Sequence, residues 1–304
     1  MLKRPTAALA LLAIAAIAAP VAAPLAAPTT DAYLRDLVAW RAKADASLRK
    51  DRGWLTLVGR HVLRYGANSV GSAPGNDVVL DAAIAPARLG TIHVGERHVR
   101  LVLADGVSMH PADSPSRRFR GERALGTDAG NGDWIAEGRL AFQVIRRDDG
   151  QAVLRVADSA AELRAKFPGR LWYEPARELV VPATFVPAAK DERITIVNVL
   201  NEVSREPAAG RLEFTLEGKA LSLDAVDDDG NLFVIFRDAT AADATYPPGR
   251  FLYLEKPKDG RWFIDFNRAY NPPCAFSAYT SCPMPPPQNV LAPRIEAGER
   301  YRGR

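Results

Sequence analysis

Residues 250–267 read RFLYLEKPKDGRWFIDFN, and this stretch holds the clearest pattern of strand, turn and strand in the chain. The segments Arg250–Glu255 and Trp262–Asn267 have the length and apolar content of strands, and the Lys-Asp-Gly sequence at 258–260 is a turn signal between them. The stretch therefore predicts a β-hairpin. Its second strand is apolar on both faces and is expected to be buried, so Asp265 inside it requires a partner.

Similar short strands recur on both sides of this hairpin. A first series comprises Trp54–Val58, His61–Tyr65, Asp77–Asp81, Arg88–Val94, His98–Leu103, Arg139–Arg147 and Gln151–Ala157, and a second comprises Ile194–Leu200, Gly210–Leu216, Lys219–Leu223 and Leu232–Arg237. Many short strands separated by turn signals indicate a mainly β protein. We expect a β-sandwich at 54–158, a proline-rich connector at 159–193 and a second antiparallel β domain, sandwich or barrel, at 194–304.

The segment 28–53 has a helical pattern instead. Apolar residues recur there at helical spacing, namely Leu34, Leu37, Val38, Trp40 and Leu48, and Gly53 can end the helix. We expect a leading helix that packs on the domain that follows it.

The first 27 residues have the composition of a secretory signal peptide. Lys3 and Arg4 precede an unbroken run of Ala, Leu and Ile at Ala7–Ala19, and small residues follow. A membrane-spanning helix needs about 20 apolar residues, and Pro20 ends this run too early. We therefore expect an exported protein, periplasmic or extracellular, with no membrane span in the mature chain.

Charge and composition exclude one class of partner. Loss of Lys3 and Arg4 with the signal peptide would lower the formal net charge of +4 by two, to +2. Basic and acidic residues are interleaved, without the basic stripe typical of nucleic-acid binding. No nucleic-acid partner is expected.

The chain has two cysteines, Cys274 and Cys282, which lie in one loop beside a proline cluster at Pro283–Pro287. An even number of cysteines in an exported protein favours a disulfide. A metal–thiolate site is the alternative, although no histidine or second cysteine pair lies nearby. The four histidines are all in the first half, and a turn at Gly95-Glu96 would place His93 opposite His98, close enough to share a metal. No third ligand is evident, so we predict no metal site.

Polar residues gather where two apolar strands of the second series end. The candidate ligand-binding residues are Arg237, Asp238, Tyr246, Arg250, Asp265, Asn267, Arg268, Tyr270 and Asn271. They predict either the mouth of a pocket or a buried network of ion pairs and Asx turns that fixes an irregular loop.

These residues leave three functions open. The first is a small-ligand-binding or accessory protein, whose arginines favour an anionic ligand. The second is a hydrolase with Asp265 or Asp238 as general acid or base. The third is a structural module of the cell envelope. No nucleophile elbow, zinc-protease motif or phosphate-binding loop is present, so no catalytic residue is assigned and no cofactor is expected.

Two resemblances add to this reading. The run Asp265–Phe276, continuing through Tyr279, Cys282-Pro283 and Pro285–Asn289, is similar to DUF1684, a family of unknown function, as are Phe236–Thr240, Tyr246 and Gly249-Arg250. The similarity is expected to run from about Trp40 to Arg300, and it implies that the polar cluster belongs to the family pattern. Separately, Leu63–Ser72 with Asn76–Leu80 resembles forkhead-associated domains. Ser72 stands where that family has an arginine, so the resemblance implies a sandwich without phosphopeptide binding.

Overall fold

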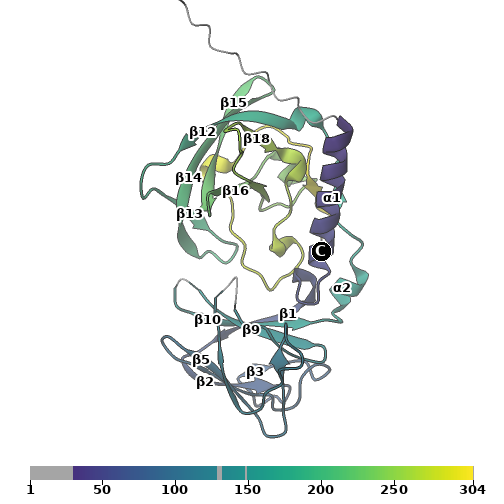
Figure 1. Ribbon diagram of the computed structural model, residues 1–304, viewed down its shortest axis with the longest axis vertical. Helices are drawn as coiled ribbons and strands as arrows, with labels where there is room; N and C mark the ends of the chain where they lie inside the picture. Colours follow the sequence, from purple (N-terminus) through teal and green to yellow (C-terminus); the bar gives the residue numbers. More distant parts are fainter. Residues whose placement is uncertain (1–29, 129–131, 148, 304) are drawn as a thin grey trace, which may run out of the picture.

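The computed structural model describes residues 30–128, 132–147 and 149–303. The expected signal peptide, 1–27, lies outside them. The chain folds as a mainly β protein with one leading helix, α1 (Thr30–Leu48), an N-terminal sandwich and a C-terminal domain built on a nearly closed sheet (Figure 1). This is the predicted fold class.

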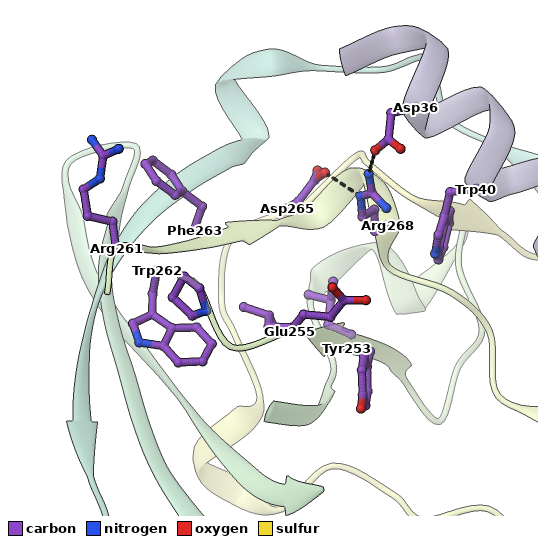
Figure 2. A pocket seen from close by; sticks show the side chains of 12 residues that line it. Asp36, Trp40, Tyr253, Glu255, Arg261, Trp262, Phe263, Asp265 and Arg268 are labelled. Atoms are coloured by element: carbon purple, nitrogen blue, oxygen red, sulfur yellow. Dashed lines mark hydrogen bonds and ion pairs between the residues drawn. The ribbon is translucent and has the colours of Figure 1, made fainter. Parts of the chain in front are cut away.

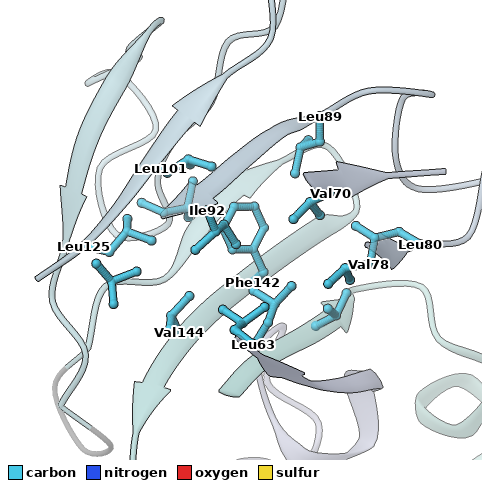
Figure 3. Packing of buried hydrophobic residues seen from close by; sticks show 14 of the residues in the cluster. Leu63, Val70, Val78, Leu80, Leu89, Ile92, Leu101, Leu125, Phe142 and Val144 are labelled. Carbon is cyan, nitrogen blue, oxygen red and sulfur yellow. The ribbon is translucent and has the colours of Figure 1, made fainter. Parts of the chain in front are cut away.

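The N-terminal domain consists of two five-stranded sheets. The first sheet has the order β1 (Leu57–Leu63), β10 (Ala152–Asp158), β9 (Leu140–Arg146), β8 (Ile135–Glu137) and β6 (His110–Pro111). The second has the order β3 (Val78–Val79), β2 (Gly66–Gly71), β4 (Gly90–Val94), β5 (Val99–Leu103) and β7 (Glu122–Leu125). Buried side chains from both sheets, such as Phe142 and Ile92, form one hydrophobic core (Figure 3). Burial of these apolar faces is what holds the sheets together.

The hairpin β4–β5 differs in register from the prediction. Val94 pairs with Val99 and His93 with Arg100, because the turn spans residues 95–98 and is closed by a 2.8 Å bond from Gly95 N to His98 O. His98 therefore lies in the turn and not opposite His93.

The C-terminal domain is built on one curved antiparallel sheet. Its order is β17 (Arg250–Leu254), β16 (Asn231–Phe236), β15 (Lys219–Asp228), β14 (Val203–Leu216), β12 (Val180–Pro187) and β18 (Trp262–Asp265), while β13 (Arg193–Val197) pairs with the first part of β14. On one side, β14 pairs first with β13 and then with β12, and the change occurs at Gly210. There φ is +146°, and a Cβ would lie 2.3 Å from Val186 O. Only glycine fits this close approach of two backbones.

Part of the expected connector belongs to this sheet. Residues 180–187 form β12, between β14 and β18, whereas 159–179 contain only α2 (Glu162–Lys166), η2 (Arg177–Leu179) and the short strand β11 (Leu171–Trp172). β11 pairs with β19 (Glu299–Arg300). Pro182 does not prevent the pairing because it faces Phe263 across the ladder, at a position that needs no backbone N–H.

Helix α1 packs on the C-terminal domain, and not on the sandwich that follows it in sequence (Figure 1). The phenol of Tyr33 donates to Asp265, Arg41 donates to Tyr173 O at 3.1 Å, and Asp45 accepts a 3.0 Å bond from Arg170 N. Leu48 also packs in a cluster with Ile194 and Ile196 of β13, so the docking of α1 depends on contacts that are distant in sequence.

Candidate functional site

A pocket of about 530 Å³ lies between β17 and β18, the two edge strands of the C-terminal sheet. Beside the pocket, the backbones of Tyr270 and Phe251 form two hydrogen bonds of 2.8 and 2.9 Å with each other. These bonds nearly close the sheet into a barrel. The pocket is lined by Asp36, Trp40, Leu252, Tyr253, Leu254, Glu255, Pro257, Arg261, Trp262, Phe263, Asp265 and Arg268 (Figure 2).

The pocket occupies the place where the sequence predicts a hairpin. β17 pairs with β16, and β18 pairs with β12, so β17 and β18 do not pair with each other. Immediately after Asp265 the chain leaves the sheet through η4 (Phe266–Arg268), which places the fully buried Phe266 ring 5.6 Å from Phe236 and 5.9 Å from Phe214. Burial of this aromatic cluster draws the chain away from the sheet. The gap between β17 and β18, called the seam below, therefore stays open.

Asp265 anchors the upper wall of the pocket. Its carboxylate caps η4 by accepting 3.1 Å bonds from the backbone and side-chain nitrogens of Asn267, and it accepts the Tyr33 phenol at 3.0 Å and Arg268 Nε at 3.2 Å. Burial and the nearby carboxylate raise the pKa of Tyr33 well above its usual value, so the phenol stays a donor. With these bonds made, Asp265 serves to hold α1 against η4.

Arg268 extends this anchor to the helix. Its guanidinium also pairs with Asp36 of α1 and lies 5.6 Å from the Trp40 ring centroid (Figure 2). The rim of the pocket is thus shared between α1 and the segment after β18.

The other walls of the pocket are aromatic. Phe263 is 48% exposed and Tyr253 is 40% exposed, although both lie within strands. Trp262 packs against Phe185 at 5.2 Å, and Trp40 packs edge-on to neighbouring rings. The prediction that β18 is buried on both faces was wrong, because the face that carries Phe263 is exposed.

Asp238 and Arg250 form a separate, fully buried ion pair. Their side chains are each 1% exposed and are joined by a 2.9 Å bond. Asp238 also caps η3 (Ala239–Ala242) and accepts Ile295 N at 2.8 Å, while Arg250 donates to Ile295 O and Ala297 O. Burial lowers the pKa of Arg250, and Asp238 opposes this effect. The pair fixes the C-terminal segment to the barrel and does not line the pocket.

Two of the nine candidate residues, Asp265 and Arg268, line the pocket. The side chain of Asn267 holds residue 176 by two 2.8 Å bonds, and Asn271 donates to Arg300 O at 2.9 Å. Tyr270 contributes its backbone to the seam, and burial raises the pKa of its phenol to about 12. Tyr246 is buried against Tyr301, and Arg237 is exposed. The candidates therefore divide between a pocket rim and a structural network.

Sequence reasoning missed the pocket residues of α1, Asp36 and Trp40, because nothing local links them to a strand more than 200 positions away. It also missed the ion pair between Arg170 and Glu299, whose side chains are 6% and 1% exposed. Glu299 accepts the backbone N–H of Asn271 at 2.8 Å. Burial raises the pKa of Glu299 to about 7, against the opposing effect of Arg170. No local sequence pattern around Glu299 signals such a pair.

Cys274 and Cys282 are buried, and their sulfurs are not joined in the structure, so the expected disulfide is not formed in it. Each sulfur accepts the backbone N–H of the other cysteine at 3.1 Å, which places the two side chains together. The hydrogen bond with Cys274 and burial raise the pKa of Cys282.

The part of the chain that the structure describes contains no group of three or more histidine, cysteine or acidic residues arranged to hold a metal ion. None of its helices is both long and apolar enough to cross a membrane.

Comparisons with known proteins agree with the resemblance drawn from the sequence. Residues 165–300 match the family described as "Protein of unknown function (DUF1684)", so the match begins well after Trp40 and does not bear on the forkhead-associated resemblance. The chain is also similar to an uncharacterized protein of Haloarcula marismortui solved by solution NMR, with 34% identity over 45% of this chain and 79% of that chain, at a TM-score of 0.39. No curated protein matches the sequence.

Proposed function

We propose that this chain, which belongs to the DUF1684 family through residues 165–300, is an exported binding protein that holds its ligand in the pocket between β17 and β18. The observation that carries the proposal is the open seam of the barrel. A pocket of about 530 Å³ is within the range of small-ligand sites. Its exposed aromatic rings give a ligand apolar surface that the fold itself does not cover.

The charges of the pocket favour a neutral or cationic ligand over the anionic one expected from the sequence. Three carboxylates line the pocket, those of Asp36, Glu255 and Asp265, against the guanidiniums of Arg261 and Arg268. Arg268 is paired with Asp265 at 3.2 Å, and Arg261 with Asp259 at 2.7 Å. An anion would have to compete with these carboxylates.

A hydrolase that uses Asp265 or Asp238 is the weaker proposal. Both carboxylates are occupied by hydrogen bonds from caps, arginines or the Tyr33 phenol. A general base must instead have a lone pair directed at the proton that it removes.

Export carries a consequence for the cysteine pair. If the protein is secreted, Cys274 and Cys282 enter an oxidising compartment with their side chains already adjacent. We expect a disulfide in the exported protein, found as resistance to alkylation without prior reduction and a mass about 2 Da below that of the dithiol. Quantitative alkylation of both thiols in protein taken from the periplasm would contradict this.

Native and denaturing mass spectrometry of the exported protein tests the binding function. We expect extra mass that is lost on denaturation. Tyr253→Ala, which removes an exposed wall of the pocket, should release this mass, and Tyr279→Ala, a partly exposed tyrosine outside the pocket lining, should retain it. A bound mass unchanged in Tyr253→Ala would place the ligand elsewhere, and a chain without ligand under every condition would contradict the proposal.

A further inference from the structure

We propose that the ligand of this pocket is an extended peptide segment with basic side chains, which binds as an added strand between β17 and β18. This inference rests on the proposed function and specifies the class of ligand. It starts from the sheet order, in which β17 has β16 as its strand neighbour and β18 has β12, so each strand presents one edge to the seam. Strand edges with free backbone groups are the usual site of β-strand addition.

The backbone of β17 faces the seam at alternate residues. Phe251 donates its N–H to Tyr270 O at 2.8 Å and accepts Tyr270 N at 2.9 Å across the seam. In an antiparallel ladder both backbone groups of a residue point to the same side, and the side alternates along the strand. The N–H and C=O of Tyr253, two residues further on, therefore point into the open part of the seam.

The backbone of β18 faces the seam from the opposite side. Phe263 lies across from Pro182 of β12, and proline has no N–H to donate. The bonded pairs of this ladder are therefore the neighbouring ones, Ile264 with Val181 and Trp262 with Ala183. The backbone groups of Phe263 thus point away from β12 and toward the pocket.

The directions of the two edges are compatible with one added strand between them. Successive strands of the sheet are antiparallel, and the path from β17 to β18 has six members, so β17 and β18 run in opposite directions. A single added strand would run antiparallel to one edge and parallel to the other. The pocket lies between these edges, and Trp40 of α1 flanks it (Figure 2). The pairing of Tyr270 with Phe251 bridges the two sides next to Leu252 of the pocket lining.

The side chains of the pocket select the chemistry of that strand. Phe263 and Tyr253 are the large exposed apolar side chains of the two edges, which suits contact with apolar residues of a guest strand. The carboxylate of Glu255 is exposed, and no ion pair is found for it in the described part of the chain. Lys256 and Lys258 of the same loop do not line the pocket. A lysine or arginine of the guest would therefore meet the excess of carboxylates.

The test uses capped six-residue peptides of alternating valine and lysine, and the same peptides with glutamate in place of lysine. Binding is followed by tryptophan fluorescence of the mature full-length protein, since Trp40 and Trp262 line the pocket. We expect the lysine peptide to bind and the glutamate peptide to bind at least about tenfold more weakly. Glu255→Lys should reduce or reverse this preference, whereas the matched control Lys256→Glu should keep it.

The backbone contacts are tested separately. A peptide between the two edges would donate alternate backbone N–H groups to β17 and to β18. N-methylation of either set should therefore weaken binding about fivefold or more for each hydrogen bond that is lost. Tyr253→Pro should bind more weakly than Tyr253→Ala, because both remove the ring and only the first removes the edge N–H. Binding that is insensitive to N-methylation, or equal in these two variants, would overturn strand addition.

The outcomes separate this inference from the proposed function. A ligand seen by native mass spectrometry and lost in Tyr253→Ala, together with no binding of either peptide, would leave the pocket as the binding site and reject the peptide. If no bound mass is seen and neither peptide binds, both proposals are rejected.

Discussion

Asp238 follows an apolar strand and Asp265 ends one, and each accepts a hydrogen bond from the backbone of the short helix that comes next. The sequence allowed either a pocket or a structural network of Asx turns for them. In the structure Asp238 has only the network, whereas Asp265 caps its helix and also lines the pocket. The difference lies in the partner, since Asp238 meets the buried Arg250 and Asp265 meets the phenol of a helix from the start of the chain.

The ion pair between Asp238 and Arg250 should be essential for stability. Asp238→Ala leaves a guanidinium buried without its carboxylate, which typically costs about 3–5 kcal/mol of unfolding free energy. The control is Asp243→Ala, whose partner Arg294 is 43% exposed, and it should change little. Urea unfolding measures both, and similar small losses in the two variants would contradict a buried pair.

Glu299 should make stability depend on pH. Its pKa is raised from a model-peptide value of 4.5 to about 7 on folding, so the unfolded chain loses this proton first as pH rises. This contribution is present below about pH 4.5 and is lost as pH rises through about 7, with a magnitude on the order of 3 kcal/mol. The difference in unfolding free energy between wild type and Glu299→Gln should fall over this range, and a difference independent of pH would rule out the shift.

At the scale of elements, many strands were predicted, but β2, β7, β8 and β12 were not, and strand partners were not predicted correctly in the barrel. Arg250–Leu254 and Trp262–Asp265 are strands, as expected, but they lie at opposite edges of one sheet. The Lys-Asp-Gly turn can reverse the chain, but it cannot choose between the neighbours β12 and β16 and a direct hairpin. That choice depends on the burial of Phe266, which lies just beyond β18, against Phe236 and Phe214.

The docking of α1 provides a prediction at this scale. Tyr33→Phe retains the ring under Arg177, 4.3 Å from its guanidinium carbon, but loses the hydrogen bond to Asp265. We expect a loss of about 1–2 kcal/mol in unfolding free energy, since the acceptor is a carboxylate. Tyr65→Phe, at a tyrosine that is 63% exposed in the sandwich, is the control. If the two variants were equally stable, the phenol would not anchor the helix.

At the scale of the molecule, the chain has separate hydrophobic cores in the sandwich and in the barrel. Helix α1 precedes the sandwich in sequence but packs on the barrel. An ion pair between Arg147 and Glu202 also links the two domains. Chains with two cores do not in general unfold in one step.

Two core substitutions should therefore act on different transitions. Phe142→Ala should destabilise the sandwich, and Leu212→Ala the barrel, each by about 3 kcal/mol or more. Calorimetry, with tryptophan fluorescence as a second probe, should show each variant shifting a different transition. One transition shifted equally by both substitutions would mean that the domains unfold as a unit.

The β class, the positions of many strands and the family followed from the sequence alone, because alternation, turn residues and a local run from Asp265 to Phe276 are properties of neighbouring residues. The packing of α1 on the second domain, the pairing of Arg170 with Glu299 and the separation of β17 from β18 became visible only in the folded chain. Each of these depends on which apolar surfaces are buried together, and that is set by the free energy of the whole core and not by any local pattern.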